Sequence, residues 1–420
     1  MLQGFHWNSA HEGEWYNNVC ERTNDLKHAG VSHVWLPPPS NSVAPEGYLP
    51  QDWFDLNTPY GSEEELRCLI DNLKDAGITP MADIVLNHRC ADEQSTGGTW
   101  NHYSNKGFQR ISRTPSIDEA FYDSWDEDEI AGNDEKFGGK GHHAKGIFDG
   151  APDLDHDSPK VRTAVVAWLK WLSRDVGFQG WRFDFAKGYD AKHIASYVHA
   201  TSNEKWLNVG EMWPEADWRS EGLAHNQDAM RQAICDFVSS CEECTSAFDF
   251  TTKAILQVAV SNCEYSRLAD QDRKPPGLLG WWPKRAVTFV DNHDTGNADH
   301  GYAQGHWSFP AGKQELGYAY ILTHPGIPCI FWPHLFGKDG TQCSEAILAL
   351  LSARRQAGIQ ADSKIKILKA EDDIYVADIA GENCSMRVKM GPRFDMDELA
   401  PLESWPLVTC GEDYAVWIMN

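Results

Sequence analysis

Short apolar runs alternate with longer amphipathic segments along most of this chain. Such alternation is typical of an α/β fold, in which helices connect parallel strands. Strand-like runs occupy residues 2–7, 31–36, 79–86, 180–185, 207–212, 248–250, 285–291 and 328–332. Helical spacing or capping residues mark segments 15–29, 62–76, 158–172, 227–242 and 344–356. Eight strand-like runs in this arrangement predict a (β/α)8 TIM barrel.

The alternation of strand-like and helix-like segments is interrupted in one long stretch, and near the C-terminus a different pattern replaces it. Residues 88–157 are rich in Gly, Asp, His and Asn and show no periodicity, which is typical of a functional loop or a small inserted domain. From about residue 365 the chain forms short alternating runs that predict an antiparallel sheet. We therefore expect a barrel from residues 1–87 and 158–358, an irregular inserted domain at 88–157 and a C-terminal β-sheet domain at 359–420.

The charge of the chain narrows the range of partners. Asp and Glu number 62 against 37 Lys and Arg, which gives a net charge of -25. Phosphate binding requires a basic face, so this balance argues against nucleic acid and anionic membranes. No apolar run approaches the roughly 20 residues of a membrane-spanning helix. A neutral polymer or a divalent cation is compatible with this composition, and we expect a monomer.

The 11 cysteines and the N-terminal residues give indications of the cellular compartment in which the protein is found. Only Cys241 and Cys244 have CxxC spacing, and no second pair lies at zinc-site distance. An odd number of scattered cysteines favours reduced thiols over a disulfide framework. The first residues resemble a strand and not a targeting signal. We expect a plastid or cytoplasmic protein, or a secreted one if a leader has been removed.

Three carboxylates follow strand-like runs, at Asp184, Glu211 and Asp294. Barrel enzymes carry their catalytic groups at the carboxyl ends of strands, so these three side chains are expected to converge. Hydrolysis of a glycosidic bond requires two carboxyl groups in different protonation states. A single Asp after a strand is more often a helix cap, so the interpretation depends on the joint pattern.

Neighbouring residues suggest different roles for two of these carboxylates. Arg182 shares a strand face with Asp184 and is expected to keep it ionised, as a nucleophile requires. A structural ion pair is the alternative. Met212 and Trp213 would form an apolar wall that raises the pKa of Glu211, as a general acid requires.

Other polar residues lie near the same strand ends. His88 and His293 could bind sugar hydroxyls, although a single histidine such as His88 is more often a satisfied polar residue. Asn87 offers a side-chain carbonyl oxygen to a hard cation.

Four motifs resemble the signature regions of the α-amylase family of glycoside hydrolases. They are Asp-Ile-Val-Leu-Asn-His at 83–88, Gly-Trp-Arg-Phe-Asp-Phe-Ala at 180–186, Gly-Glu-Met-Trp at 210–213 and Phe-Val-Asp-Asn-His-Asp at 289–294. Further segments, such as Val-Trp-Leu-Pro-Pro-Pro-Ser at 34–40, resemble plant-type members. The likeness extends over nearly the whole chain.

This resemblance implies endohydrolysis of α-1,4-glucosidic bonds in starch and maltooligosaccharides, with retention of configuration. It implies Asp184 as nucleophile, Glu211 as acid/base and Asp294 as stabiliser of the transition state. The sugar-binding residues that it implies are Tyr48, His88, Arg182, Lys187, Trp213 and His293. The alternatives are a transglycosylase, an exo-acting maltooligosaccharide enzyme and a non-enzymatic glucan-binding module.

The resemblance also implies a calcium ion. Its ligands would be the Asn87 side chain, the Gly188 carbonyl, Asp153 and an Asp upstream of Asp153. His143 stands at that upstream position, and calcium prefers oxygen to nitrogen. The site is therefore expected to be weakened, or rebuilt with Asp149 or Asp134.

Trp281 and Trp282 resemble a surface platform that holds starch granules in plant-type enzymes. Two adjacent tryptophans between Gly280 and Pro283 would suit stacking on a glucan. The alternative is a tryptophan pair that wedges a loop against the barrel.

Overall fold

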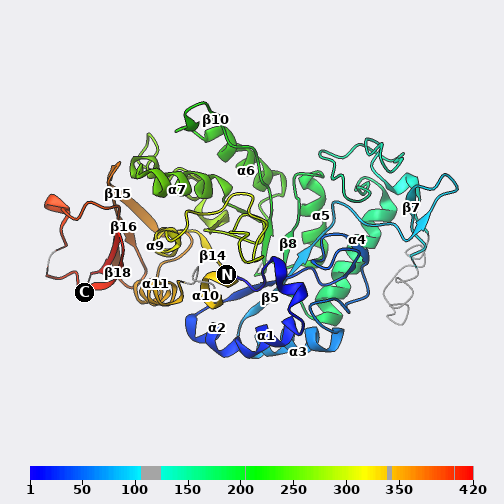
Figure 1. The fold of residues 1–420 in the computed structure, drawn as a ribbon, viewed down its shortest axis with the longest axis horizontal. Helices are drawn as coiled ribbons and strands as arrows, with labels where there is room; N and C mark the ends of the chain where they lie inside the picture. Colours follow the sequence, from blue (N-terminus) through cyan, green and yellow to red (C-terminus); the bar gives the residue numbers. More distant parts are fainter. Residues whose placement is uncertain (106–123, 204, 338–342, 402, 420) are drawn as a thin grey trace.

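A closed barrel of eight parallel strands lies at the centre of the molecule, as the sequence predicts (Figure 1). The structure is a computed structural model that describes residues 1–105, 124–203, 205–337, 343–401 and 403–419. Around the barrel the strands follow the order β1, β14, β13, β12, β9, β8, β5, β2. Their bounds are β1 Leu2–Gln3, β2 His33–Leu36, β5 Thr79–Ile84, β8 Gly180–Phe183, β9 Leu207–Gly210, β12 Ser246–Phe248, β13 Ala286–Phe289 and β14 Ile327–Phe331.

Helices surround this barrel. They are α1 Trp15–Glu21, α2 Thr23–Ala29, α3 Glu63–Asp75, α4 Pro159–Trp171, α5 Ala191–Thr201, α6 Asp228–Ser240, α7 Phe250–Asn262, α8 Leu278–Trp281, α9 Gln314–Thr323, α10 Trp332–Phe336 and α11 Ser344–Ala357. The single helix expected at 15–29 is two helices, because the backbone N–H of Arg22 bonds to two carbonyls of the preceding turn and α2 begins there. None of the helices in the described part of the chain is long and apolar enough to cross a membrane.

Most barrel strands end earlier than the apolar runs suggest. The apolar pattern continues past the last ladder hydrogen bond because the loops at this rim are themselves buried. The run at 248–250 is the clearest case. Asp249 accepts a hydrogen bond from the N–H of Thr252, so it caps α7, and Phe250 begins a helix. Strand ends, and hence the positions of rim residues, therefore depend on capping as well as on hydrophobicity.

The C-terminal residues form the expected antiparallel sheet, at the left of Figure 1. Its order is β15, β16, β17, β19, β18. The bounds are β15 Lys364–Glu371, β16 Ile374–Ala380, β17 Ser385–Met390, β18 Leu407–Gly411 and β19 Tyr414–Ile418. The edge strand β18 is half-exposed and was not predicted, because its face shows no clear alternation. The sheet packs against α9 and α11.

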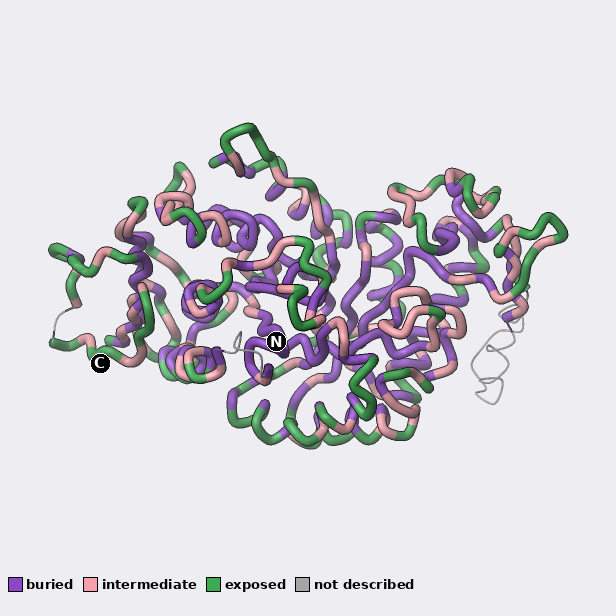
Figure 2. The backbone as a smooth tube through the Cα atoms, in the orientation of Figure 1, coloured by how far each residue is buried: buried purple, intermediate pink, exposed green. Residues whose placement is uncertain are grey.

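The irregular segment between β5 and α4 lies at the right of Figure 1. Its described residues contain one small antiparallel sheet, β6 (Glu93–Gln94) with β7 (Trp100–His102). Isolated bridges join Tyr103 to Trp125, Ile130 to Leu154 and His88 to Asp153. Residues 106–123 of the inserted domain expected at 88–157 lie outside the described residues. The chain is buried from Met81 through Arg89, and Figure 2 shows buried, intermediate and exposed stretches alternating in the segment beyond.

Candidate active site

Two of the three carboxylates lie directly after barrel strands. Asp184 follows β8 and Glu211 follows β9, and these strands are neighbours in the barrel. Arg182 lies within β8 and pairs in register with Asp83 of β5. Three adjacent strands therefore bring these four charged side chains to one rim.

The guanidinium group of Arg182 binds three carboxylates at once. Its Nη1 donates to Asp83 at 2.8 Å and to Asp184 at 2.7 Å, and its Nη2 lies 2.5 Å from Glu211 Oε1. Arg182 and Asp83 have no exposed surface, whereas Asp184 and Glu211 are 8% and 7% exposed. The two candidate catalytic carboxyls are thus held on one rigid cation, and each keeps a small opening toward solvent.

Both candidate catalytic carboxyls have raised pKa values. Burial is the main cause for each, and it raises the pKa of Asp184 to about 7 and that of Glu211 to about 8. Arg182 lowers both values, but neighbouring acids, including Asp294, raise them again. Arg182 was expected to keep Asp184 ionised; it does lower the pKa of Asp184, but burial has the larger, opposite effect. Glu211 nevertheless stays protonated to a higher pH than Asp184.

Asp294 reaches the same site from a loop. It lies beyond the end of β13, where its N–H donates to Asn292 Oδ1 at 3.0 Å. Gln304 donates to its Oδ1 at 2.6 Å, and His293 Nε2 lies 3.3 Å from its Oδ2. This carboxylate is only half-buried, so it faces the space in which a substrate would lie.

Stacked aromatic rings form one wall of the site. The ring of Tyr48 lies 5.0 Å from that of His293 and 6.0 Å from that of Trp7, in nearly parallel planes. The Tyr48 hydroxyl donates to Asp83 at 2.9 Å, which joins this wall to the charged network. Trp7 was expected to lie in the first strand, but β1 ends at Gln3 and Trp7 begins a 3-10 helix, Trp7–His11. The apolar pattern alone does not show that the Trp7 side chain points into the site.

His88 and Phe148 form a second wall. Their rings stack at 4.0 Å, and His88 Nε2 lies 2.8 Å from the carbonyl oxygen of Tyr48. Burial lowers the pKa of His88 and of His293 to about 4, so both imidazoles are neutral near pH 7. Neutral imidazoles can donate or accept a hydrogen bond without adding charge, which suits contact with sugar hydroxyls.

A cavity of about 370 Å³ lies between these walls. It is lined by Trp7, Tyr48, His88, Phe148, Asp184, Phe185, Lys187, Glu211, Trp213, His293, Asp294, Gln304 and His306. The sequence pointed to eight of these, and Arg182 lies buried beneath them. It missed Trp7 and Phe185, which lie in predicted strand runs but beyond the observed strands, and Phe148, Gln304 and His306, which come from loops without a periodic signal.

Phe185 has an unusual backbone at the centre of the site. Its φ is 42°, in the left-handed region that is costly for a bulky side chain. In this conformation its N–H donates to Glu211 Oε2 at 3.2 Å. The strained residue therefore helps to orient the candidate acid, and the surrounding barrel maintains the strain.

The three residues expected to bind calcium lie together. The side-chain amide of Asn87 bonds to the Asp153 carboxylate, and an ideal Cβ on Gly188 would lie 1.9 Å from Asn87 Oδ1. The pKa of Asp153 is raised to about 7, mainly by burial and also by the nearby charge of Asp134. A cation here would offset the clustering of buried acids, so these oxygen donors fit calcium.

The fourth expected ligand is not a nitrogen of His143, which is exposed. Asp134 is buried and accepts a hydrogen bond at 2.9 Å from the N–H of Asp153, whereas Asp149 is exposed. Among the described residues, no three or more His, Cys, Asp or Glu side chains are arranged to hold a metal ion. A calcium site at this place would therefore need amide and carbonyl oxygens in addition to the carboxylates.

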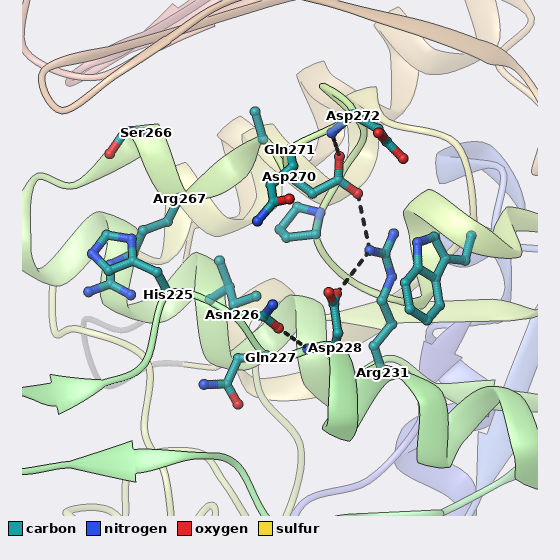
Figure 3. Close-up of a pocket in the computed structure, with 14 residues that line it drawn as sticks. His225, Asn226, Gln227, Asp228, Arg231, Ser266, Arg267, Asp270, Gln271 and Asp272 are labelled. Atoms are coloured by element: carbon teal, nitrogen blue, oxygen red, sulfur yellow. Dashed lines mark hydrogen bonds and ion pairs between the residues drawn. The ribbon is translucent and has the colours of Figure 1, made fainter.

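Trp281 and Trp282 lie apart from the candidate active site. Trp281 ends α8 and is 41% exposed, whereas Trp282 is half-buried against the core. The Arg231 guanidinium lies 3.8 Å from the ring centre of Trp281. Figure 3 shows the adjacent cavity of about 280 Å³, where Arg231 pairs with Asp270 and Asp228.

Comparison with known proteins places this geometry in a family. A family model described as "Alpha amylase, catalytic domain" matches residues 8–346. The chain belongs to the α-amylase family. A second model, "Alpha-amylase C-terminal beta-sheet domain", matches residues 356–418. The α-amylase family consists of glycoside hydrolases, and this chain is an enzyme of that class.

Two plant relatives are similar over nearly the whole chain. "Probable alpha-amylase 2" of Arabidopsis thaliana is 41% identical over 99% of this chain and 93% of that protein. "Alpha-amylase 3, chloroplastic" of the same species is 38% identical over 99% of this chain, which spans 44% of that protein. An α-amylase structure from Anoxybacillus shares the fold, with a TM-score of 0.65 and 14% identity over 96% of this chain and 90% of that one.

Proposed function

We propose that this enzyme cleaves internal α-1,4-glucosidic bonds in starch and maltooligosaccharides, with retention of anomeric configuration. One observation carries the proposal: a single guanidinium, that of Arg182, binds both Asp184 and Glu211 in one cavity. Retaining enzymes need their two carboxyl groups only about 5–5.5 Å apart, and shared binding to one cation favours such a short separation. The family assignment supports the same reaction.

The two carboxyls take different roles in this proposal. Asp184 has the lower pKa and attacks the anomeric carbon, which forms a covalent glycosyl–enzyme bond. Glu211 donates its proton to the departing glycosidic oxygen and then removes a proton from the incoming water. Asp294 faces the same space and stabilises positive charge on the sugar ring in the transition state.

The remaining side chains hold the sugar. Tyr48 and His293 offer a flat aromatic surface beneath it, and His88 lies on the opposite wall. Lys187 and Trp213 also line the cavity, and we place the leaving part of the glucan beside them. Arg182 acts on the substrate through the carboxyls that it binds.

Calcium, in this proposal, is bound by Asn87, Asp153 and the Gly188 carbonyl, with Asp134 in place of the residue at 143. When bound, the ion would neutralise the buried acids and tie the inserted segment to the barrel rim. We further propose a division into a barrel (1–87 and 158–358), an inserted domain (88–157) and a C-terminal domain (359–420).

Trp281 and Trp282 are proposed as a starch-binding platform at the surface. The exposed face of Trp281 and the polar cavity beside it support this role (Figure 3). A monomer located in the plastid or cytoplasm is our proposal for the enzyme in the cell, and the chloroplastic relative supports it.

The decisive experiment measures whether the cleaved bonds lie inside the glucan chain and which anomer the first products carry. With amylose, iodine colour should disappear early, before much reducing sugar accumulates, and NMR of the first products should show the α-anomer. The Asp184→Asn variant should lose activity by at least about a thousandfold while it still binds glucan. Slow loss of colour with steady release of one small sugar would contradict endo cleavage, and β-anomeric products would contradict retention.

A further inference from the structure

A buried ion pair lies next to the loop that carries Asp294. Lys253 belongs to α7, and Asp291 lies two residues beyond the end of β13. The two residues are only 1% and 3% exposed, and their charged atoms lie 2.9 Å apart. Taking both charges out of water is costly, and an apolar pair of similar size often stabilises a fold equally well. Stability alone therefore does not account for this pair, and its contacts lead to the loop.

Asp291 binds both ends of the loop, which comprises residues 292–309. Near the start, the hydroxyl of Thr295 donates to Asp291 Oδ1 at 3.2 Å. At the end, the N–H of Phe309 lies 3.2 and 3.3 Å from the two carboxylate oxygens and donates to them. One buried carboxylate thus holds the two ends of the loop together.

Lys253 holds the far end of the loop as well. Its Nζ donates to Gln257, one turn later in α7, at 2.7 Å. Gln257 donates in turn to the carbonyl oxygen of Ser308 at 2.8 Å. The ring centres of Trp307 and Phe309 lie 5.8 and 5.6 Å from the same ammonium group, a distance at which a cation and an aromatic ring attract each other. A single cation therefore ties α7 to the end of the loop.

Hydrogen bonds within the loop orient Asp294. The side-chain oxygen of Asn292 accepts from the N–H groups of Asp294 and Thr295, at 3.0 and 2.8 Å. The N–H of His306 donates to the carbonyl oxygen of Asp294 at 3.0 Å, and Gln304 donates to its carboxylate. Because Thr295 follows Asp294 directly and is bound to the ion pair, a shift of that pair would be passed on to the Asp294 carboxylate.

We propose that Lys253 and Asp291 are positioning residues for the cleavage reaction, because their ion pair holds the loop in the conformation in which the Asp294 carboxylate faces the sugar. A charged group stabilises a transition state best when it is already oriented before the reaction. Neither residue of the pair lines the active-site cavity, so both act through the loop. This proposal rests on the proposed function, in which Asp294 stabilises the transition state.

The test removes both charges of the pair at once. The double variant Lys253→Met/Asp291→Asn replaces them by neutral side chains of similar shape and leaves no unpaired buried charge, so it should fold. Its kcat on amylose should fall about tenfold to a hundredfold, as expected when a reacting group is displaced by about 1 Å. Its KM should change little, because the side chains that line the cavity for the sugar are unaltered.

The pH profile is a second readout, which a merely structural role would not move. The charge of Asp294 raises the pKa of both Asp184 and Glu211. When the loop no longer holds Asp294 close to them, both pKa values should fall and the profile of kcat/KM should move to lower pH. Thr295→Val removes one bond between the loop and Asp291 without changing a charge. It should lower kcat and move the profile in the same direction, by a smaller amount.

Lys389→Met is the matched control, because Lys389 is also buried, at 3% exposed, but lies in β17 of the C-terminal sheet. It should leave kcat, KM and the pH profile at their wild-type values, whatever its effect on the melting temperature. Wild-type kcat in the double variant, or a loss of kcat with an unchanged pH profile, would overturn the proposal. If the double variant does not fold, Thr295→Val decides by the same criteria. Failure of the unaltered enzyme to cleave amylose would instead refute the proposed function.

Discussion

At the scale of single residues, the site depends on the charge balance around Arg182. One buried cation binds Asp83, Asp184 and Glu211, so its removal would leave three buried acids without the positive charge that compensates them. Breaking a buried ionic network in this way typically costs about 3–5 kcal/mol. The Arg182→Met variant should therefore lose stability by about that amount, measured by denaturant unfolding.

The matched control is Arg22→Met. Arg22 pairs with Asp25 on the surface, where both side chains are about half-exposed. Such pairs contribute about 1 kcal/mol or less. Equal stability losses in the two variants would show that the buried network has no special energetic role.

The pH dependence of activity follows from the two raised pKa values. Activity requires an ionised Asp184 and a protonated Glu211. Below about pH 7 Asp184 takes up a proton, and above about pH 8 Glu211 loses its proton. The profile of kcat/KM should therefore be a narrow bell centred between these values. A plateau of kcat/KM from about pH 5 to 6 would contradict this pair of protonation states.

The residues found from sequence share one property, and those that were missed share another. Asp184 and Glu211 directly follow regular strands, so chain order and barrel geometry predicted their place. Trp7 and Gln304 reach the site from irregular turns, where no periodicity shows the direction of a side chain. The raised pKa of Asp184 was missed because burial cannot be judged from a neighbouring arginine alone.

At the scale of elements, capping decides where helices begin. Ser62 accepts from the N–H of Glu65, and the Glu65 carboxylate accepts in return from the N–H of Ser62. Ser62→Ala should cost about 1 kcal/mol of stability, seen as a lower melting temperature. Ser158 is the control, since it precedes α4 without a side-chain cap bond. A larger loss in Ser158→Ala would contradict the capping argument.

Helix boundaries were predicted best where a capping motif and the apolar pattern agreed. The helix after Ser62 had both a capping box and an apolar stripe, and α3 begins at the next residue. The segment at 15–29 had only the stripe, which cannot reveal the break at Arg22. Edge strand β18 had neither signal, because a strand exposed on both faces needs no alternation.

At the scale of the whole molecule, the proposed calcium site would join the inserted segment to the barrel. Asn87 lies just beyond β5, and Asp153 lies at the end of the insertion, where it pairs with His88. Chelation with EDTA should therefore lower the melting temperature, and added calcium should restore it. Asp153→Asn should abolish this response. No change on chelation in the unaltered enzyme would show that the site does not bind calcium.

The shortest strand of the barrel also has a consequence for synthesis of the chain. Strand β1 consists of two residues, and it pairs on one side with β2 and on the other with β14. Its second partner therefore leaves the ribosome only after Phe331 has been added to the chain. Until then Gln3 cannot settle against His293, and the catalytic rim stays open. A nascent or prematurely terminated chain should thus be unable to digest polysaccharide.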